Sequence, residues 1–99
     1  MVYEVANGVL IYYLPEELDH YAADMLKRKT AHVFDEEEIR YLIFDFSKTQ
    51  FMDSSGIALI LRARRRMRTL GGSLLVCRVP QQARRVLDAA GIDRVVTIR

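Results

Sequence analysis

A short polar segment, Asp53-Ser54-Ser55-Gly56, contains the residues of this 99-residue chain that are best suited to chemistry. It precedes a run with helical spacing, so Ser54 or Ser55 is predicted to be a helix N-cap, its hydroxyl accepting a hydrogen bond from a free backbone N–H. A helix N-terminus favours negative charge, and phosphorylation of Ser54 would add about −1.5 to −2 charges there, opposed by the like charge of Asp53. Gly56 is expected to leave room for the close approach of a partner's backbone or nucleotide. The segment therefore predicts an exposed serine that can be modified.

The rest of the sequence offers no catalytic or metal-binding pattern. Asp-Ser-Ser-Gly does not match the Gly-x-Ser-x-Gly nucleophile elbow, and neither Gly-x-x-x-x-Gly-Lys nor Gly-x-Gly-x-x-Gly occurs. His20 and His32 are not spaced as a metal-binding pair, and the only cysteine, Cys77, lies in an apolar run where a small buried side chain is expected. We therefore predict a protein that is not an enzyme and holds no metal and no cofactor of its own.

A buried strand and a helix are predicted on either side of the serine segment. Tyr41–Phe46 is a nearly continuous run of β-favouring residues, which is typical of a strand covered on both faces. The helix is expected from about Ser55 to Leu70, and one arc of it should pack on the sheet: Leu59, Ile60, Ala63, Met67 and Leu70. The serine segment thus falls at the carboxyl edge of the sheet, where binding sites of open α/β folds are found.

Two apolar residues of the same helix, Ile57 and Leu61, fall outside that arc. Helical projection places them beside three basic residues, Arg64, Arg65 and Arg68, on the side near Ser54. An apolar pair inside a basic rim suits the docking of a partner protein. The alternative is that a neighbouring helix or the Phe51-Met52 segment buries the pair, and the sequence leaves both possibilities open.

The remaining segments complete a single α/β domain over residues 1–99. Asn7-Gly8 favours a type I′ turn in an N-terminal hairpin, Asp19 is a suitable N-cap, and the acidic run 35–38 is expected to be a solvated loop. The expected strands are 2–6, 9–13, 41–46, 73–79 and 94–98, and the expected helices are 19–34, 55–70 and 80–91. The predicted order is β-β-α-β-α-β-α-β, a mixed, mostly parallel sheet with helices packed on it.

Composition and charge narrow the class of protein. Apolar residues make up 51% and charged residues 28%, as in an ordinary folded protein, and no window is apolar enough for a membrane span. The first residues do not form a secretory signal, so a cytoplasmic protein is expected. The net charge of +2 is small, and the five arginines between positions 62 and 68 have no interleaved aromatic residue to stack on bases. Nucleic-acid binding through this helix is the least favoured function.

The segment Phe51-Met52-Asp53-Ser54-Ser55-Gly56, following a predicted buried strand, resembles the signature of STAS domains, specifically the SpoIIAA-like anti-sigma factor antagonists. The resemblance extends over nearly the whole chain. Residues 17–20 are similar to the family's segment before its first helix, 71–77 to a later strand, and 87–92 to its third helix and exit turn. Relatives commonly add a helix beyond the position of Arg99, and apolar surface without that helix would favour a weak homodimer.

The resemblance implies a binding protein controlled by phosphorylation. The unmodified form would bind an anti-sigma factor that is also a serine kinase carrying ATP or ADP, and so free a sigma factor for transcription. The kinase would phosphorylate Ser54 and dissociate, and a serine phosphatase would reverse the change. Partner-binding residues implied by the loop match are Asp53, Ser55 and Gly56, with Glu17 and Asp19 in a segment that can lie nearby. Sporulation and stress-response roles both fit, and a non-switching STAS scaffold or ligand-binding module in a stress-signalling complex remains the alternative.

Overall fold

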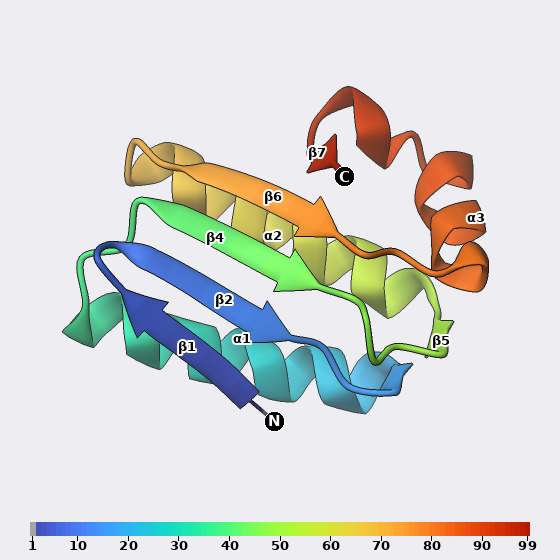
Figure 1. Ribbon diagram of the computed structural model, residues 1–99, viewed down its shortest axis with the longest axis horizontal. Coiled ribbons are helices and arrows are strands. Elements are labelled where there is room, and N and C mark those ends of the chain that lie inside the picture. Colours follow the sequence, from blue (N-terminus) through green and yellow to red (C-terminus); the bar gives the residue numbers. More distant parts are fainter. Residues whose placement is uncertain (1) are drawn as a thin grey trace.

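A five-stranded sheet forms the centre of the computed structural model, which describes residues 2–99 (Figure 1). The strands lie in the order β1-β2-β4-β6-β7, with β1 antiparallel to β2 and every other neighbouring pair parallel. Their bounds are β1 Val2–Ala6, β2 Val9–Tyr13, β4 Tyr41–Asp45, β6 Ser73–Cys77 and β7 Thr97–Ile98. The predicted mixed, mostly parallel α/β architecture is confirmed.

The N-terminal hairpin has the predicted bounds and turn. Asn7 and Gly8 both have positive φ angles, 52° and 80°, as a type I′ turn requires. The carbonyl oxygen of Gly8 also accepts hydrogen bonds from the backbone N–H groups of Arg40 and Tyr41, at 2.7 and 3.1 Å. The same turn therefore fixes both the hairpin and the start of the central strand β4.

A second, very short parallel ribbon lies beyond the end of the main sheet. It pairs β3 (Glu17–Leu18) with β5 (Phe51–Met52), and each of these strands leads through one aspartate into a helix. Strand β3 enters α1 (His20–Glu36), and β5 enters α2 (Ser54–Thr69). The sequence did not predict this ribbon, because two residues are too few to show the alternation of a strand.

Helices α1 and α2 cover the same face of the sheet, whereas α3 (Gln81–Ala89) lies beyond its end, near β5 (Figure 1). A 3-10 turn, η1 (Ile92–Arg94), connects α3 to β7 in place of part of the strand expected there. The core lies between the sheet and the two helices. Its sheet side consists of Leu10, Tyr12, Leu42, Phe44, Leu74 and Val76, all buried.

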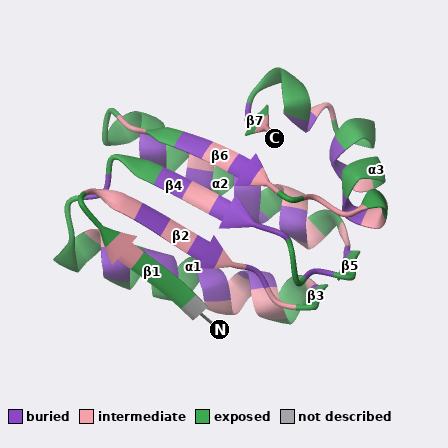
Figure 2. Ribbon diagram, in the orientation of Figure 1, coloured by how far each residue is buried: buried purple, intermediate pink, exposed green. Residues whose placement is uncertain are grey.

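Within residues 2–99, no helix covers the opposite face of the sheet, so the expectation that β4 is covered on both faces was wrong (Figure 2). Ile11, Ile43 and Leu75 lie side by side across β2, β4 and β6, and each is half-buried. Cys77, predicted to be buried, is also half-buried on this face. An unbroken apolar run therefore indicates a central strand, but it does not say whether a second layer covers it.

Helix ends account for two further corrections. Helix α1 continues to Glu36, so the acidic run begins inside the helix, and its C-cap is Glu37 rather than a residue near Phe34. Leu70, predicted to pack on the sheet, is the C-cap of α2 and is 48% exposed, because the chain turns away at Gly71 with φ +74°. Along residues 2–99, no helix is both long and apolar enough to cross a membrane.

Candidate functional site

Ser54 is the first residue of α2, and its side chain is exposed. The N-cap is Asp53, whose carboxylate accepts a hydrogen bond from the backbone N–H of Ser55 at 2.8 Å, so the prediction of a serine cap was wrong. Aspartate caps a helix as well as serine does. Over the part of the chain that the structure describes, the Ser54 hydroxyl makes no hydrogen bond. Its oxygen is therefore accessible to solvent, in a place that the helix dipole makes favourable for negative charge.

A side chain from α3 holds the segment that leads to Ser54. The amide oxygen of Gln82 accepts a hydrogen bond from the backbone N–H of Met52 at 2.8 Å, and its amide nitrogen donates to the carbonyl oxygen of Met52 at 3.0 Å. Gln82 thus satisfies both backbone groups of Met52, as a neighbouring strand would. Sequence reasoning missed this residue, since nothing in its local pattern connects it with a position 30 residues earlier.

Gly56 packs inside the protein rather than facing a partner. A Cβ atom at this position would lie 2.5 Å from the side chain of Met52 and 3.1 Å from that of Leu18, and Gly56 is buried. The space that glycine leaves is therefore filled by the protein's own β3–β5 ribbon. The expectation that Gly56 leaves room for the close approach of a partner's backbone or nucleotide does not agree with its burial.

The ribbon brings Glu17 and Asp19 close to the serine segment. Glu17 lies opposite Phe51 in the β3–β5 register, and the backbone N–H of Asp53 donates to the carbonyl oxygen of Leu18 at 3.3 Å. Asp19 caps α1 by accepting from the backbone N–H of Ala22 at 3.0 Å, just as Asp53 caps α2. Asp19 thus has a structural task, whereas Glu17 is exposed beside Ser54's loop.

A shallow apolar groove runs from Ser54 along α2 and α3; we call it the α2–α3 groove. Its lining comes from Ser54, Ile57, Ala58 and Leu61 on α2, from Arg85, Val86 and Ala89 on α3, and from Ala90, the C-cap of α3. Leu61 is 38% exposed and Ile57 is half-buried. Helix α3 therefore covers the predicted apolar pair only in part, and it contributes half of a surface that sequence analysis had assigned to α2 alone.

The arginines of α2 do not form one basic rim around that groove. The Nε of Arg64 donates to the carbonyl oxygen of Val95 at 2.9 Å, and Arg64 and Arg68 both line a separate hollow beside β7. Arg66 points the other way, its guanidinium 5.2 Å from the centre of the Phe34 ring. Of the three predicted rim residues, Arg65 alone is exposed and does not line that hollow. The expected grouping of Arg64 and Arg68 with Ile57 was therefore wrong. A continuous phosphate-binding face is also absent from the described part of α2.

Metal binding has no support in residues 2–99, where no group of three or more His, Cys, Asp and Glu side chains is placed to hold an ion. His20 and His32 are both exposed at the surface of α1, and His32 lies 2.9 Å from Glu36. The chemistry that this site offers is therefore an exposed hydroxyl at a helix start, beside a groove built by two helices.

Comparisons with known proteins identify the family and the fold of the chain. A family model described as STAS domain matches residues 1–99. The chain is 33% identical over 92 residues to the anti-sigma F factor antagonist of Paenibacillus polymyxa, which corresponds to 93% of this chain and 79% of that protein. The solved structure of the anti-sigma factor antagonist SpoIIAA in its unphosphorylated form is similar with a TM-score of 0.88 and 23% identity, covering 99% of this chain and 86% of that one. The solved structure of the Bacillus cell fate determinant SpoIIAA in the phosphorylated form is similar with a TM-score of 0.78 and 23% identity. The match covers 99% of this chain and 89% of that one.

Proposed function

This chain belongs to the STAS domain family of anti-sigma factor antagonists, and we propose that its unphosphorylated form binds a serine-kinase anti-sigma factor and so releases a sigma factor. The kinase then transfers a phosphate from its bound ATP to Ser54, and the complex dissociates. A serine phosphatase removes the phosphate and restores binding. The chain itself supplies the acceptor hydroxyl and the docking surface, while the nucleotide belongs to the partner.

The observation that carries this proposal is the position of Ser54. It is exposed, its hydroxyl has no hydrogen bond to another described residue, and it lies at one end of the α2–α3 groove. A kinase can reach such a hydroxyl, and a partner seated on Ile57 and Leu61 would cover it. Modification and docking therefore compete for the same place on the molecule.

Electrostatics explains why phosphorylation of Ser54 would weaken partner binding rather than strengthen it. A phosphate on Ser54 would add about −1.5 to −2 charges next to the carboxylate of Asp53. The helix dipole tolerates this charge while it is solvated, so the fold should persist. A partner covering the groove would have to desolvate the charge, which is unfavourable unless a counter-charge is provided. Binding is lost while the domain remains folded.

The test is to incubate the protein with ATP and a serine-kinase anti-sigma factor from the same cell, followed by intact-mass measurement and peptide mapping. We expect one phosphate, on Ser54, and loss of the complex as it accumulates. Ser54→Ala should bind and remain unmodified, and Ser54→Asp should fail to bind with an unchanged circular dichroism spectrum. Ser55→Ala is the matched control, because the capping bond uses the backbone of Ser55 rather than its hydroxyl.

Three results would contradict the proposal. A stable complex without phosphate would indicate a non-switching scaffold, and binding retained by Ser54→Asp would separate Ser54 from the docking surface. Absence of both binding and phosphate with every such kinase would reject the partner as well.

A further inference from the structure

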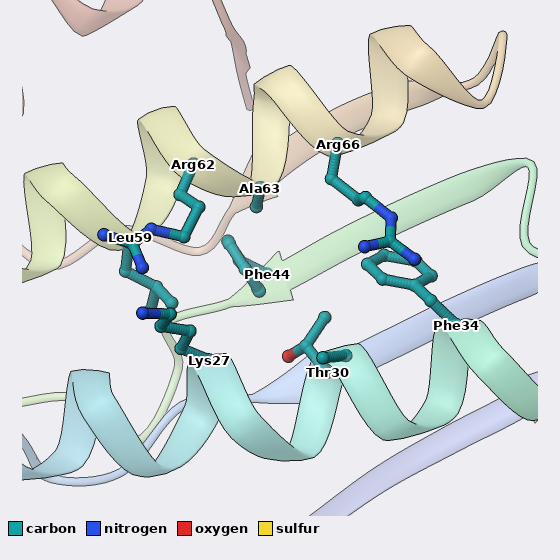
Figure 3. A pocket seen from close by; sticks show the side chains of 9 residues that line it. Lys27, Thr30, Phe34, Phe44, Leu59, Arg62, Ala63 and Arg66 are labelled. Carbon is teal, nitrogen blue, oxygen red and sulfur yellow. The ribbon is translucent and has the colours of Figure 1, made fainter.

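A second cavity lies on the other side of α2, between α2 and α1; we call it the α1–α2 cleft (Figure 3). Its walls come from both helices, and Phe44 of β4 reaches its floor. The lining residues are Lys27, Thr30, Ala31, Phe34, Phe44, Leu59, Arg62, Ala63 and Arg66. None of these residues takes part in the function proposed above.

The interior of the cleft is apolar and has the size of a small organic group. Phe44, Leu59 and Ala63 are buried, and together with Phe34 they present carbon atoms to the cavity. The volume is about 180 Å³. An apolar cavity of about 150 Å³ is large enough to hold a benzene ring. A ring or a short alkyl chain would therefore fill this cleft.

The rim is cationic, and two of its charges have no acidic partner. Lys27 and Arg62 line the same cavity from opposite helices, and neither lies within 4.0 Å of a carboxylate among the ion pairs of residues 2–99. Asp24, which lines the adjoining hollow together with Lys27 and Arg62, is paired with Arg28 at 2.6 Å. Arg66 is less available, since it lies over the ring of Phe34 and 3.9 Å from Asp35. Two facing cations without a counter-ion attract an anion.

We propose that the α1–α2 cleft binds a small anionic amphiphile. Its carboxylate or phosphate group would lie between Lys27 and Arg62, and its alkyl or aryl group would pack on Phe44 and Leu59. The cleft continues past Lys27 and Arg62 into a more polar hollow lined by His20, Asp24 and Ser55. The carboxylate of Asp24 disfavours a further negative charge in that hollow, so the anionic group belongs between Lys27 and Arg62. This site is separate from the α2–α3 groove, so it does not depend on the proposed function.

The test uses sodium octanoate as the probe and follows backbone amide shifts of the full chain by NMR. We expect saturable shifts at Thr30, Leu59 and Ala63. Octan-1-ol has the same chain without the charge and should bind at least about tenfold more weakly, because a charged hydrogen bond contributes more than that factor. The double variant Lys27→Gln/Arg62→Gln should lose a similar factor. Arg65→Gln, an exposed arginine elsewhere on α2, is the matched control and should bind normally.

A filling variant tests the cavity independently of charge. Ala31 is exposed at the rim, so Ala31→Leu should leave the fold intact and weaken octanoate binding by occupying the cleft. The proposal is overturned if no saturation occurs by about 10 mM, an affinity within reach of a ligand of this size. It is also overturned if octan-1-ol or inorganic phosphate binds equally well, if Arg65→Gln weakens binding as much as the double variant, or if the shifts centre on Ile11, Ile43 and Leu75.

Discussion

The α2–α3 groove and the α1–α2 cleft flank one helix, yet they are suited to different ligands. The groove is shallow, apolar and edged by Arg85, and it begins at an exposed serine. The cleft is narrower, with Phe44 at its floor and, at its rim, two cations that form no ion pair within the described part of the chain. The difference arises from the neighbours of α2: α1 packs along the sheet beside it, whereas α3 lies beyond the sheet end (Figure 1).

This difference shows how a short amphipathic helix can serve two surfaces. Only five residues of α2 are buried: Gly56, Leu59, Ile60, Ala63 and Met67. Both flanks of that buried stripe therefore remain accessible. The residues of α1 determine the polarity of one flank, and those of α3 determine the polarity of the other. A broad apolar surface suits a protein partner, while a smaller and deeper one suits a small molecule.

The largest expected effect comes from placing a charge on one flank at a time. Leu61→Glu should weaken kinase binding by at least about 100-fold, the scale of a buried interface residue, and change the free energy of unfolding by less than about 0.5 kcal/mol. Octanoate binding should be unchanged. Lys27→Glu is the mirror variant and should abolish octanoate binding while the kinase still binds. Titration calorimetry would measure the binding of both variants to the kinase and to octanoate. Loss of both kinds of binding in either variant would contradict the independence of the two surfaces.

Gly56→Ala should disturb both flanks together, because Gly56 fixes α2 against the β3–β5 ribbon. A methyl group 2.5 Å from the side chain of Met52 requires repacking, and we expect a loss of about 2 kcal/mol in the free energy of unfolding. Helix propensity alone predicts the opposite sign, a gain of up to about 1 kcal/mol. Urea denaturation measures the change in the free energy of unfolding. Ala58→Gly, at an exposed position on the same turn, measures the effect of helix propensity alone. A stabilised Gly56→Ala would show that the ribbon does not constrain α2.

Gln82→Ala should affect the α2–α3 groove more than the cleft. It removes both hydrogen bonds to the backbone of Met52, which we expect to cost about 1–2 kcal/mol of stability and to accelerate hydrogen exchange at the Met52 N–H. Kinase affinity should fall about tenfold, since the Ser54 segment is less well held. Gln81→Ala, at an exposed neighbouring position, is the control, and an equal effect of both variants would indicate a general change in α3.

The smallest effect is expected at Cys77, on the open sheet face away from both surfaces. Burial, and secondarily the charge of Asp45, raise the pKa of the Cys77 thiol above its ordinary value of 9.0. The thiol should therefore react with iodoacetamide more slowly at pH 8 than a cysteine in an unfolded peptide. Above pH 9.0 the unfolded chain releases this proton before the folded one, so stability should fall as pH rises through the folded pKa. Cys77→Ser should reduce this dependence of stability on pH. An iodoacetamide reaction rate equal to that of the unfolded peptide would contradict the raised pKa of Cys77.

Much of the fold was predictable, because its signals are local. Asn7-Gly8 and the flanking alternation gave both hairpin strands to the residue, and Asp19 was identified as a cap. The serine segment was placed correctly at the start of α2, although Asp53 rather than a serine caps it. Such patterns depend on a few neighbouring residues, and those are what a single sequence displays.

What the sequence could not show depends on contacts between distant segments. The ribbon of β3 and β5 joins residues 34 positions apart in register, Glu17 with Phe51, and neither strand has a pattern of its own. The amide bridge from Gln82 to Met52 is equally non-local. The α1–α2 cleft requires two helices to be packed before it exists. The arginines of α2 form one group in the sequence, but tertiary packing distributes them among different surfaces.

The Asn7-Gly8 turn has a consequence for how the chain folds. It is the only sheet pairing in residues 2–99 that closes through two residues, and such hairpins form in about 1–10 μs. Each parallel pair instead requires a connection containing a helix, and closing these long connections costs more entropy. Because the Gly8 carbonyl already receives the N–H groups of Arg40 and Tyr41, the earliest element to form is also the template on which β4 aligns. The rate-limiting step is then expected at the docking of β4, and the Ser54 segment acquires its place only after it.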